Sequence, residues 1–188
     1  MKHPFKTTAL ACAAALALAS PSFAALKVGT HAPDFSASAF LAGNPLTFKL
    51  SDALKKGPVV VYFFPSAHTK GCNLEAHLFS EAIDDFKAQK ATVIGVTAGK
   101  LNELADFSKE TEHCGGKFAV AADPGAKIAK EYDAPLKMGG VVVPRDLSAR
   151  TSYVIAKNGN VVFAYDNLDA SDHVNQTLNA VKALNAKK

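Results

Sequence analysis

Two apolar runs constrain the fold of this chain more than any other feature of its sequence. Val59–Phe64 and Thr92–Val96 are rich in β-branched and aromatic residues. Such near-continuous runs are typical of strands that are buried on both faces of a sheet. The segment between them, Leu74–Lys87, has the pattern of a helix. We therefore expect an α/β architecture in which helices cover a central sheet.

The alternation of strands and helices continues along the chain. Further strands are expected at Thr47–Leu50, Phe118–Ala121, Thr151–Ala156 and Val161–Tyr165, and further helices at Leu101–Glu112, Ala126–Tyr132 and Ala170–Ala186. The sequence Lys-Asn-Gly-Asn at 157–160 is a tight-turn signal that predicts an antiparallel hairpin between the last two strands. This order predicts a thioredoxin-like fold, with a central mixed sheet flanked by helices. No internal repeat follows residue 24, so residues 25–188 are expected to form one domain.

The first 24 residues have a different composition from the rest. Lys2 and Lys6 give a basic start, Thr8–Ala19 is an apolar run, and Ser22-Phe23-Ala24 is a small-x-small cleavage signal. This pattern predicts a secretory signal peptide over residues 1–24, too short and too weakly flanked for a membrane span. We therefore expect a periplasmic or secreted protein with no membrane attachment after cleavage.

Composition and charge exclude some classes of function. The 188 residues are 48% hydrophobic and 20% charged, which is typical of a soluble globular domain. Removal of residues 1–24 takes away two lysines and no acids, so the formal net charge falls from +4 to +2. The remaining lysines are scattered among acidic residues, and we expect no nucleic-acid partner.

Only two cysteines, Cys72 and Cys114, remain after residue 24. In an exported and oxidising compartment they can form a structural disulfide, act as a catalytic pair, or be one reactive thiol and a bystander. Cys72 has the more informative setting, because the Val59–Phe64 strand leads through Pro65 and a short polar loop into the first turn of a helix. Unpaired backbone N–H groups and the helix dipole favour a thiolate there. We therefore expect Cys72 to be an activated nucleophile.

The spacing of Pro65, Thr69 and Cys72, P-x-x-x-T-x-x-C, resembles the active-site motif of the peroxiredoxins. Tyr-Phe-Phe-Pro before the loop and Gly-Cys-x-x-Glu at 71–75 resemble the Q-type, bacterioferritin-comigratory-protein-like branch. The resemblance extends through the domain in Ala-Pro-Asp-Phe at 32–35, Asp-Pro at 123–124 and Arg150 before the strand Thr151–Ala156.

The resemblance implies a thiol-dependent peroxidase. Cys72 would attack hydrogen peroxide or a small organic hydroperoxide and become a sulfenic acid. Arg150 would stabilise the thiolate and hold the peroxide, Thr69 would exchange hydrogen bonds with it, and Pro65 would shield the sulfur. Neither haem, flavin nor metal is implied. A thioredoxin-like or other periplasmic thiol reductant would recycle the enzyme, which we expect to be a monomer or homodimer.

Several of these residues also have structural interpretations. Thr69 can cap the helix, Arg150 can be an ordinary arginine at the start of a strand, and Glu75 can reflect only the preference for acidic residues near a helix start. Cys72 can be a small buried side chain, although apolar packing alone does not require Pro65 and Thr69 beside it.

The chain departs from the Q-type pattern at two positions near Cys72. Lys70 stands where proline is usual, and His77 stands where many members carry a resolving cysteine. Cys114 is then the remaining partner within the chain, and we expect it to resolve the sulfenic acid; the alternative is a bystander with an external thiol. A disulfide needs Cα atoms within about 7 Å of each other, which would demand local unwinding.

Two other classes of function stay open at the level of sequence. One is a copper- or zinc-binding chaperone that uses His68, Cys72 and a distal histidine such as His77 or His113. We expect these histidines instead to be exposed polar residues. The other is a non-catalytic thioredoxin-like protein in which Cys72 and Cys114 form a permanent disulfide. A thiol–disulfide oxidoreductase is disfavoured because no second cysteine completes a C-x-x-C motif.

Overall fold

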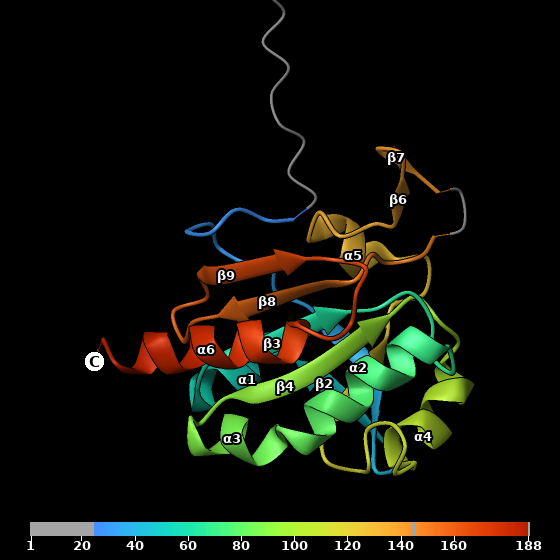
Figure 1. Ribbon diagram of the computed structural model, residues 1–188, viewed down its shortest axis with the longest axis horizontal. Helices are drawn as coiled ribbons and strands as arrows, with labels where there is room; N and C mark the ends of the chain where they lie inside the picture. The colour runs from blue at the N-terminus through green and yellow to red at the C-terminus, as the bar shows by residue number, and fades with distance from the viewer. Residues whose placement is uncertain (1–24, 144–145, 188) are drawn as a thin grey trace, which may run out of the picture.

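The computed structural model describes residues 25–143 and 146–187, so the expected signal peptide at 1–24 lies outside the described residues. Seven strands form one mixed sheet in the order β2-β1-β5-β4-β3-β8-β9 (Figure 1). Strands β3, β4 and β5 are parallel, and the other neighbouring pairs are antiparallel. The expected central mixed sheet is confirmed. The strands are β1 (Ser36–Leu41), β2 (Asn44–Lys49), β3 (Val59–Phe63), β4 (Thr92–Thr97), β5 (Ala119–Ala122), β8 (Thr151–Ile155) and β9 (Val161–Asp166).

Strand β3 lies in the middle of the sheet, and every one of its residues is buried. Val59, Val61 and Phe63 point into one apolar cluster, whereas Val60 and Tyr62 point into the other. This alternation is what a strand covered on both faces requires. The burial that was expected from the unbroken apolar run is therefore confirmed.

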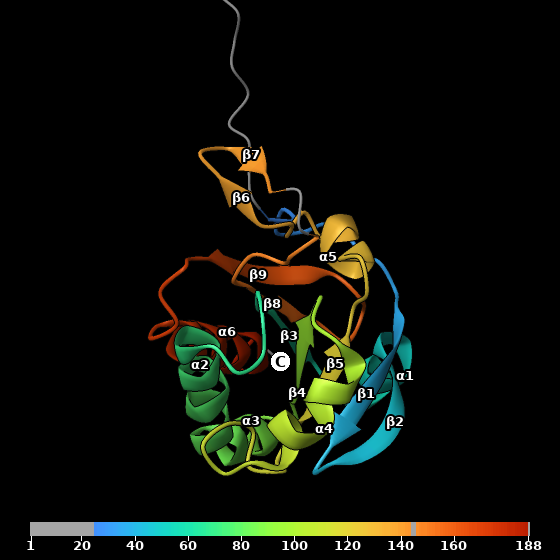
Figure 2. The same ribbon diagram turned by 90° about the vertical axis from the view of Figure 1, so that its right-hand side faces the viewer.

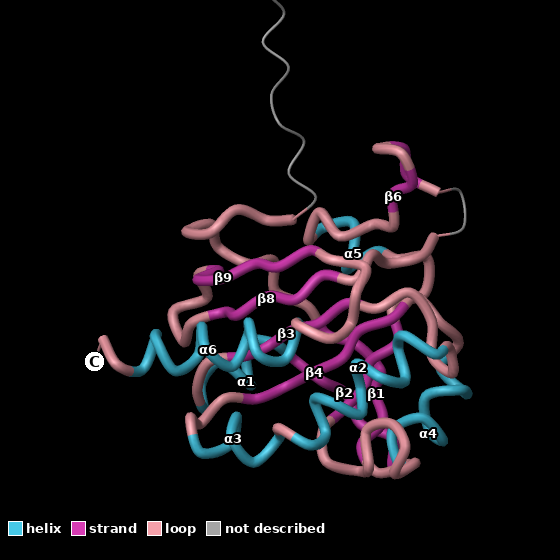
Figure 3. The backbone as a smooth tube through the Cα atoms, in the orientation of Figure 1, coloured by secondary structure: helices cyan, strands magenta, loops and turns pink. Residues whose placement is uncertain are grey.

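Helices cover both faces of the sheet, as the tube in Figure 3 and the turned view in Figure 2 show. On one face lie α2 (Lys70–Glu81), α3 (Ile83–Ala88), α4 (Leu101–Lys109) and α6 (His173–Asn185), and on the other lie α1 (Leu50–Lys56) and α5 (Lys127–Glu131). Both cysteines belong to the cluster under the first of these faces. No helix in the described part of the chain is long and apolar enough to cross a membrane.

Two element predictions need correction. The single helix expected at Leu74–Lys87 begins four residues earlier, at Lys70, and is interrupted at Ala82, which separates α2 from α3. No proline or glycine marks this break. The strand expected at Thr47–Leu50 begins at Asn44, and Leu50 is the first residue of α1.

The sequence analysis also missed four elements. Strand β1 pairs with β2 across the two-residue turn Ala42-Gly43, whose φ angles are 50° and 79°. Helix α1 and the short strands β6 (Lys137–Met138) and β7 (Val141–Val142) were not expected either. The hairpin of β6 and β7 projects away from the sheet in both ribbon views. By contrast, the expected hairpin at 157–160 joins β8 to β9, with Gly159 at a φ of 86°.

Candidate active site

Cys72 lies in the first turn of α2, as the sequence predicts, and its side chain is 2% exposed. Strand β3 leads to this point, and the chain then turns through the loop 65–69 before Lys70 begins the helix. The first backbone N–H groups of α2 lack partners within the helix, so this end carries partial positive charge. A sulfur anion is favoured in such a place.

Arg150 reaches the sulfur because of the pairing between β3 and β8. Phe63 pairs with Thr151, so the preceding residue, Arg150, lies beside the end of β3 where the active-site loop begins. Its Nη2 atom donates a hydrogen bond to Cys72 Sγ over 3.5 Å, and the side chain is buried. Gly71 permits this approach, since a Cβ atom there would lie 3.0 Å from Nη2.

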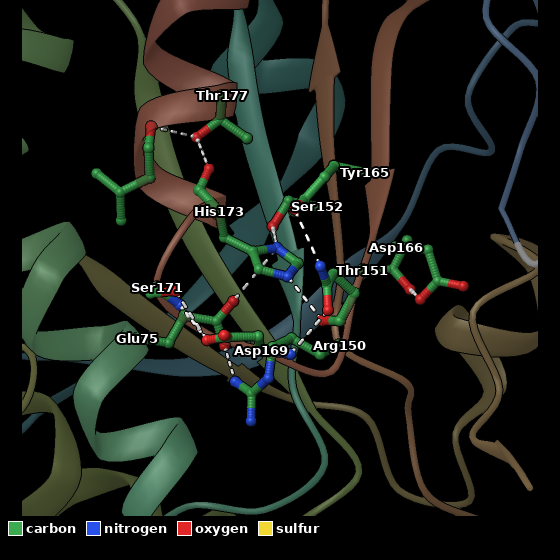
Figure 4. Close-up of polar contacts among 12 residues, drawn as sticks. Glu75, Arg150, Thr151, Ser152, Tyr165, Asp166, Asp169, Ser171, His173 and Thr177 are labelled. Carbon is green, nitrogen blue, oxygen red and sulfur yellow. Dashed lines mark hydrogen bonds and ion pairs between the residues drawn. The ribbon is translucent and has the colours of Figure 1, made fainter.

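The guanidinium of Arg150 is held by two further contacts. Its Nε donates to the carbonyl of Leu168 over 2.9 Å, and its Nη1 donates a hydrogen bond to Oε2 of Glu75 (Figure 4). Burial lowers the pKa of Arg150, but Glu75 and Cys72 raise it more, so the guanidinium stays charged. These two contacts fix the orientation of the guanidinium, so that Nη2 faces the sulfur.

Glu75 lies one helical turn after Cys72 and is fully buried. Burial raises the pKa of its carboxyl to about 8, against the lowering effect of Arg150. Its Oε2 contacts Arg150, whereas Oε1 has no hydrogen-bond partner among the described residues. From the sequence alone, Glu75 could have reflected only a helix-start preference. In the structure it contacts Arg150 and so belongs to the site.

His173, the first residue of α6, lies behind Glu75 (Figure 4). Its Nδ1 atom is 3.6 Å from Glu75 Oε1 and 2.7 Å from the hydroxyl of Ser152. Its Nε2 lies 2.8 Å from the carbonyl of Asn167, which can only accept, so Nε2 carries the proton and Ser152 donates to Nδ1. Burial lowers the pKa of His173 to about 4, and the ring is neutral at physiological pH.

Thr69 occupies the N-cap position of α2, but its side chain does not cap the helix. The hydroxyl donates to the carbonyl of Ser66 over 3.0 Å instead, so the capping interpretation is wrong. Thr69 is exposed at the mouth of the site, while Pro65 is half-buried at the start of the loop. Both lie within a few residues of Cys72, as their spacing requires, and neither has a hydrogen bond to the sulfur among the described contacts.

Cys114 was expected just after a helix over Leu101–Glu112. The helix α4 ends earlier, at Lys109, and Cys114 lies in a turn five residues later. Its side chain is fully buried, and burial strongly raises the pKa of its thiol. Gly115 and Gly116 follow with φ angles of 57° and 70°. Both Cys72 and Cys114 are free thiols in this structure.

The histidines do not gather around Cys72. His68 is exposed and His77 is half-buried, whereas His113 is buried, which corrects the expectation that it is exposed. His113 stacks on Phe107, with ring centroids 4.7 Å apart. Among the described residues, His68 groups with Glu110 and His113 and not with Cys72 or His77. The geometry therefore gives no support to a metal chaperone built on Cys72.

His173, Ser152 and the Leu168 carbonyl were missed as parts of the site. Ser152 lies in an expected strand and His173 lies in an expected helix, but their sequence neighbours carry no motif. The one available signal was the strand that begins at Thr151, since alternate residues of a strand share a face. Arg150 and Ser152 are two residues apart; Arg150 contacts Glu75, and Ser152 contacts His173.

Sequence comparisons agree with the geometry of this site. The AhpC/TSA family matches residues 28–164. Peroxiredoxin Q of Oryza sativa subsp. japonica is 33% identical over 131 residues, which are 69% of this chain and 57% of the rice protein. Peroxiredoxin Q of Sedum lineare is 30% identical over 163 residues, 86% of this chain and 81% of that protein. The chain thus spans little more than half the length of the rice relative.

Solved structures show the same fold. Peroxidoxin BcpB from Mycobacterium tuberculosis superposes with a TM-score of 0.72 at 23% identity, over 85% of this chain and 98% of that one. The reduced 2-Cys peroxiredoxin of Plasmodium vivax gives a TM-score of 0.72 at 22% identity, over 85% of this chain and 97% of its own. The expected thioredoxin-like fold is confirmed, and with the sequence matches it shows that the chain belongs to the AhpC/TSA family, the peroxiredoxins.

Proposed function

We propose that this protein is a thiol-dependent peroxidase whose nucleophile is Cys72. The observation that carries the proposal is the hydrogen bond from Arg150 Nη2 to Cys72 Sγ, 3.5 Å long, at the N-terminus of α2. A buried cysteine that served only packing would not need a buried guanidinium beside its sulfur. Family membership and the relatives named peroxiredoxin support the same activity.

In the reaction, the Cys72 thiolate attacks the terminal oxygen of hydrogen peroxide or a small organic hydroperoxide. An S–O bond forms, the O–O bond breaks, and the released oxygen takes up a proton to leave as water or an alcohol. Cys72 becomes a sulfenic acid. Arg150 faces the sulfur with a fixed edge, so its N–H groups are placed to hold the peroxide as negative charge moves to the leaving oxygen.

Thr69 and Pro65 shape the entrance to the sulfur in this proposal. The Thr69 hydroxyl now donates to Ser66, and rotation about its Cα–Cβ bond would release it toward an incoming peroxide. Pro65 offers no N–H group and would shield the sulfur from water at the start of the loop. The small space around a 2% exposed thiol favours a small peroxide over a bulky one.

The sulfenic acid is resolved by Cys114 or by an external thiol. Cys114 shares an apolar cluster with Cys72, which supports an internal disulfide, but both side chains are buried and must first become exposed to each other. The turn at Gly115-Gly116 is a natural place for that opening. A thioredoxin-like or other periplasmic thiol reductant then completes the cycle. The basic start, apolar run and cleavage signal of residues 1–24 support an exported location.

Mass spectrometry after one equivalent of peroxide tests this function. In the wild type we expect the loss of two hydrogens as Cys72 and Cys114 join, and in Cys114→Ser we expect one added oxygen on Cys72. Cys72→Ser should show neither change. The proposal fails if Cys72→Ser consumes peroxide as fast as the wild type. A wild type that gains oxygen and forms no disulfide would instead assign resolution to an external thiol.

A further inference from the structure

A cluster of potential metal ligands includes one residue of the active-site loop. It consists of His68 in that loop, Glu110 at the end of α4 and His113 in the turn before Cys114. One ring nitrogen from each histidine and one carboxylate oxygen all lie within 4.8 Å of one another. Two imidazoles and one carboxylate form a donor set that suits zinc and other divalent transition metals.

The hydrogen bonds of His68 leave one of its nitrogens facing the cluster. Nε2 lies 3.3 Å from the carbonyl of Glu103. A carbonyl can only accept, so Nε2 carries a proton and Nδ1 of the neutral ring presents a lone pair. In that tautomer the lone pair and Oε2 of Glu110 lie 4.0 Å apart, and a bound cation would lie between these two acceptors. A backbone carbonyl that fixes one histidine nitrogen while the other faces the ion is the usual arrangement around bound metals.

His113 supplies an independent sign of a ligand. Its side chain is 10% exposed, and stacking on Phe107 fixes the orientation of its ring. Nδ1 lies 2.8 Å from Glu110 Oε2, but it is buried and has no hydrogen-bond partner in the described part of the chain, so the two atoms are close without being aligned. A buried polar nitrogen without a partner is costly, and a metal ion would satisfy it.

We propose that His68, Glu110 and His113 bind a divalent transition-metal ion, with zinc as the representative. Zinc bonds to nitrogen and oxygen near 2.1 Å place tetrahedral ligand atoms about 3.4 Å apart. The observed separations of 2.8 and 4.0 Å lie on either side of this value, so small movements of the half-buried Glu110 and the exposed His68 side chains would bring both to it. Three protein ligands leave a fourth position for water.

The site joins two segments that flank the cysteines. His68 immediately precedes Thr69 in the active-site loop, and His113 immediately precedes Cys114. An ion bound to both would hold the loop against the turn that buries Cys114. The bound metal would therefore slow any opening that exposes Cys114. Binding itself depends only on the cluster and would persist if the proposed peroxidase activity proved absent.

A zinc titration tests the site directly. Untagged protein carrying Cys12→Ser, Cys72→Ser and Cys114→Ser has no thiol left as a competing ligand, and calorimetry then gives the dissociation constant. We expect one zinc ion per chain, with His68→Gln and Glu110→Gln each weakening binding at least tenfold. These two residues are exposed or half-buried, so both variants should keep the wild-type circular dichroism.

His77→Gln is the matched control, because His77 is another histidine beside a single glutamate, Glu81, at 3.5 Å. It should leave the dissociation constant unchanged. The site is wrong if His68→Gln and Glu110→Gln bind zinc as tightly as their parent. It is equally wrong if the control loses as much affinity as they do.

A labelling experiment tests the link to Cys114. In Cys72→Ser protein, we expect zinc to slow maleimide labelling of Cys114 severalfold, and Glu110→Gln should remove that effect. Equal labelling rates with and without zinc would overturn the proposed link between the two segments. Slowing that survives Glu110→Gln would contradict it as well, because zinc would then be acting on the thiol itself.

Discussion

Cys72 and Cys114 are buried to nearly the same degree in the same apolar cluster, yet their surroundings differ in charge. Cys72 lies at a helix N-terminus with a guanidinium 3.5 Å from its sulfur. Cys114 lies in a turn, and burial alone raises the pKa of its thiol. Burial therefore does not distinguish the proposed nucleophile, Cys72, from Cys114. The placement of positive charge does.

Exchanging each thiol for a hydroxyl gives the largest test of this contrast. Cys72→Ser should lower the rate of peroxide consumption by at least about a thousandfold, because Cys114 has no helix N-terminus or guanidinium beside it and burial raises the pKa of its thiol. Cys114→Ser should still form a sulfenic acid on Cys72, which a dimedone-type trap detects by mass. Trapping on Cys114 in the Cys72→Ser protein would reverse the assignment of the two roles.

Arg150→Lys tests whether a fixed guanidinium or merely a positive charge distinguishes Cys72. A lysine ammonium cannot contact Cys72, Glu75 and the Leu168 carbonyl at once. We expect the second-order rate constant with peroxide to fall about a hundredfold in stopped-flow measurements. Lys70→Ala removes an exposed cation from the first turn of α2 and should change the rate less than about twofold, since exposed charges are screened. Equal losses in both variants would point to a general electrostatic effect.

Glu75 and His173, on the polar side of Cys72, make the stability of the folded state depend on pH. Between pH 4.5 and about 8 the folded state keeps a proton on Glu75 that the unfolded state has lost, so stability falls as pH rises. Between pH 4 and 6.5 the unfolded state binds a proton on His173 that the folded state does not, so stability rises with pH. The two effects oppose each other up to pH 6.5.

Urea unfolding of the wild type and Glu75→Gln should separate these effects. From pH 6.5 to 8 only Glu75 remains, and the wild type should lose about 2 kcal/mol relative to the variant. Glu75→Gln should instead gain stability from pH 4.5 to 6.5 and stay level above it. Parallel curves for the two proteins over the whole range would show that Glu75 titrates normally in the folded state.

The smallest expected effect concerns the space that lets Arg150 reach Cys72. A Cβ atom at Gly71 would lie 3.0 Å from Nη2 of Arg150, so Gly71→Ala should displace the guanidinium and lower the peroxide rate constant severalfold. Gly99→Ala is the control, because its added Cβ would meet Thr97 at an ordinary 3.6 Å. A rate unchanged in Gly71→Ala would mean that the arginine accommodates the methyl group without losing its place.

Much of the fold could be predicted from the sequence where one signal dominates. Strands β3 and β4 are unbroken apolar runs, and the last hairpin has an Asn-Gly turn. Strand β1 was missed because its buried residues, Ala37 and Ala39, are too small to give a strong β pattern. Its turn, Ala42-Gly43, also lacks the usual asparagine or aspartate.

The candidate site was predictable only in part, for a physical reason. Cys72 has a local signal, because strand, loop and helix follow one another directly in sequence. Arg150 has none of its own and was identified by resemblance, since strand pairing brings it across 78 positions to the sulfur. His173 is more distant still, and its role depends on packing between α6 and the sheet. The hydroxyl of Thr69 donates to the carbonyl of Ser66 because its rotamer depends on the nearest acceptors in space. The spacing of residues in the sequence does not specify these acceptors.

The contact between Arg150 and Leu168 has a consequence for how relatives of this protein can differ. The family match ends at residue 164, and three supporting residues lie beyond it. The carbonyl of Leu168 accepts from Arg150, and His173, which the carbonyl of Asn167 orients, lies against Glu75. The support of Arg150 is thus divided between the body that the family model matches and the segment that follows it. An exchange of α6 and its lead-in between two peroxiredoxins would transplant the support of the arginine while leaving the motif around Cys72 untouched.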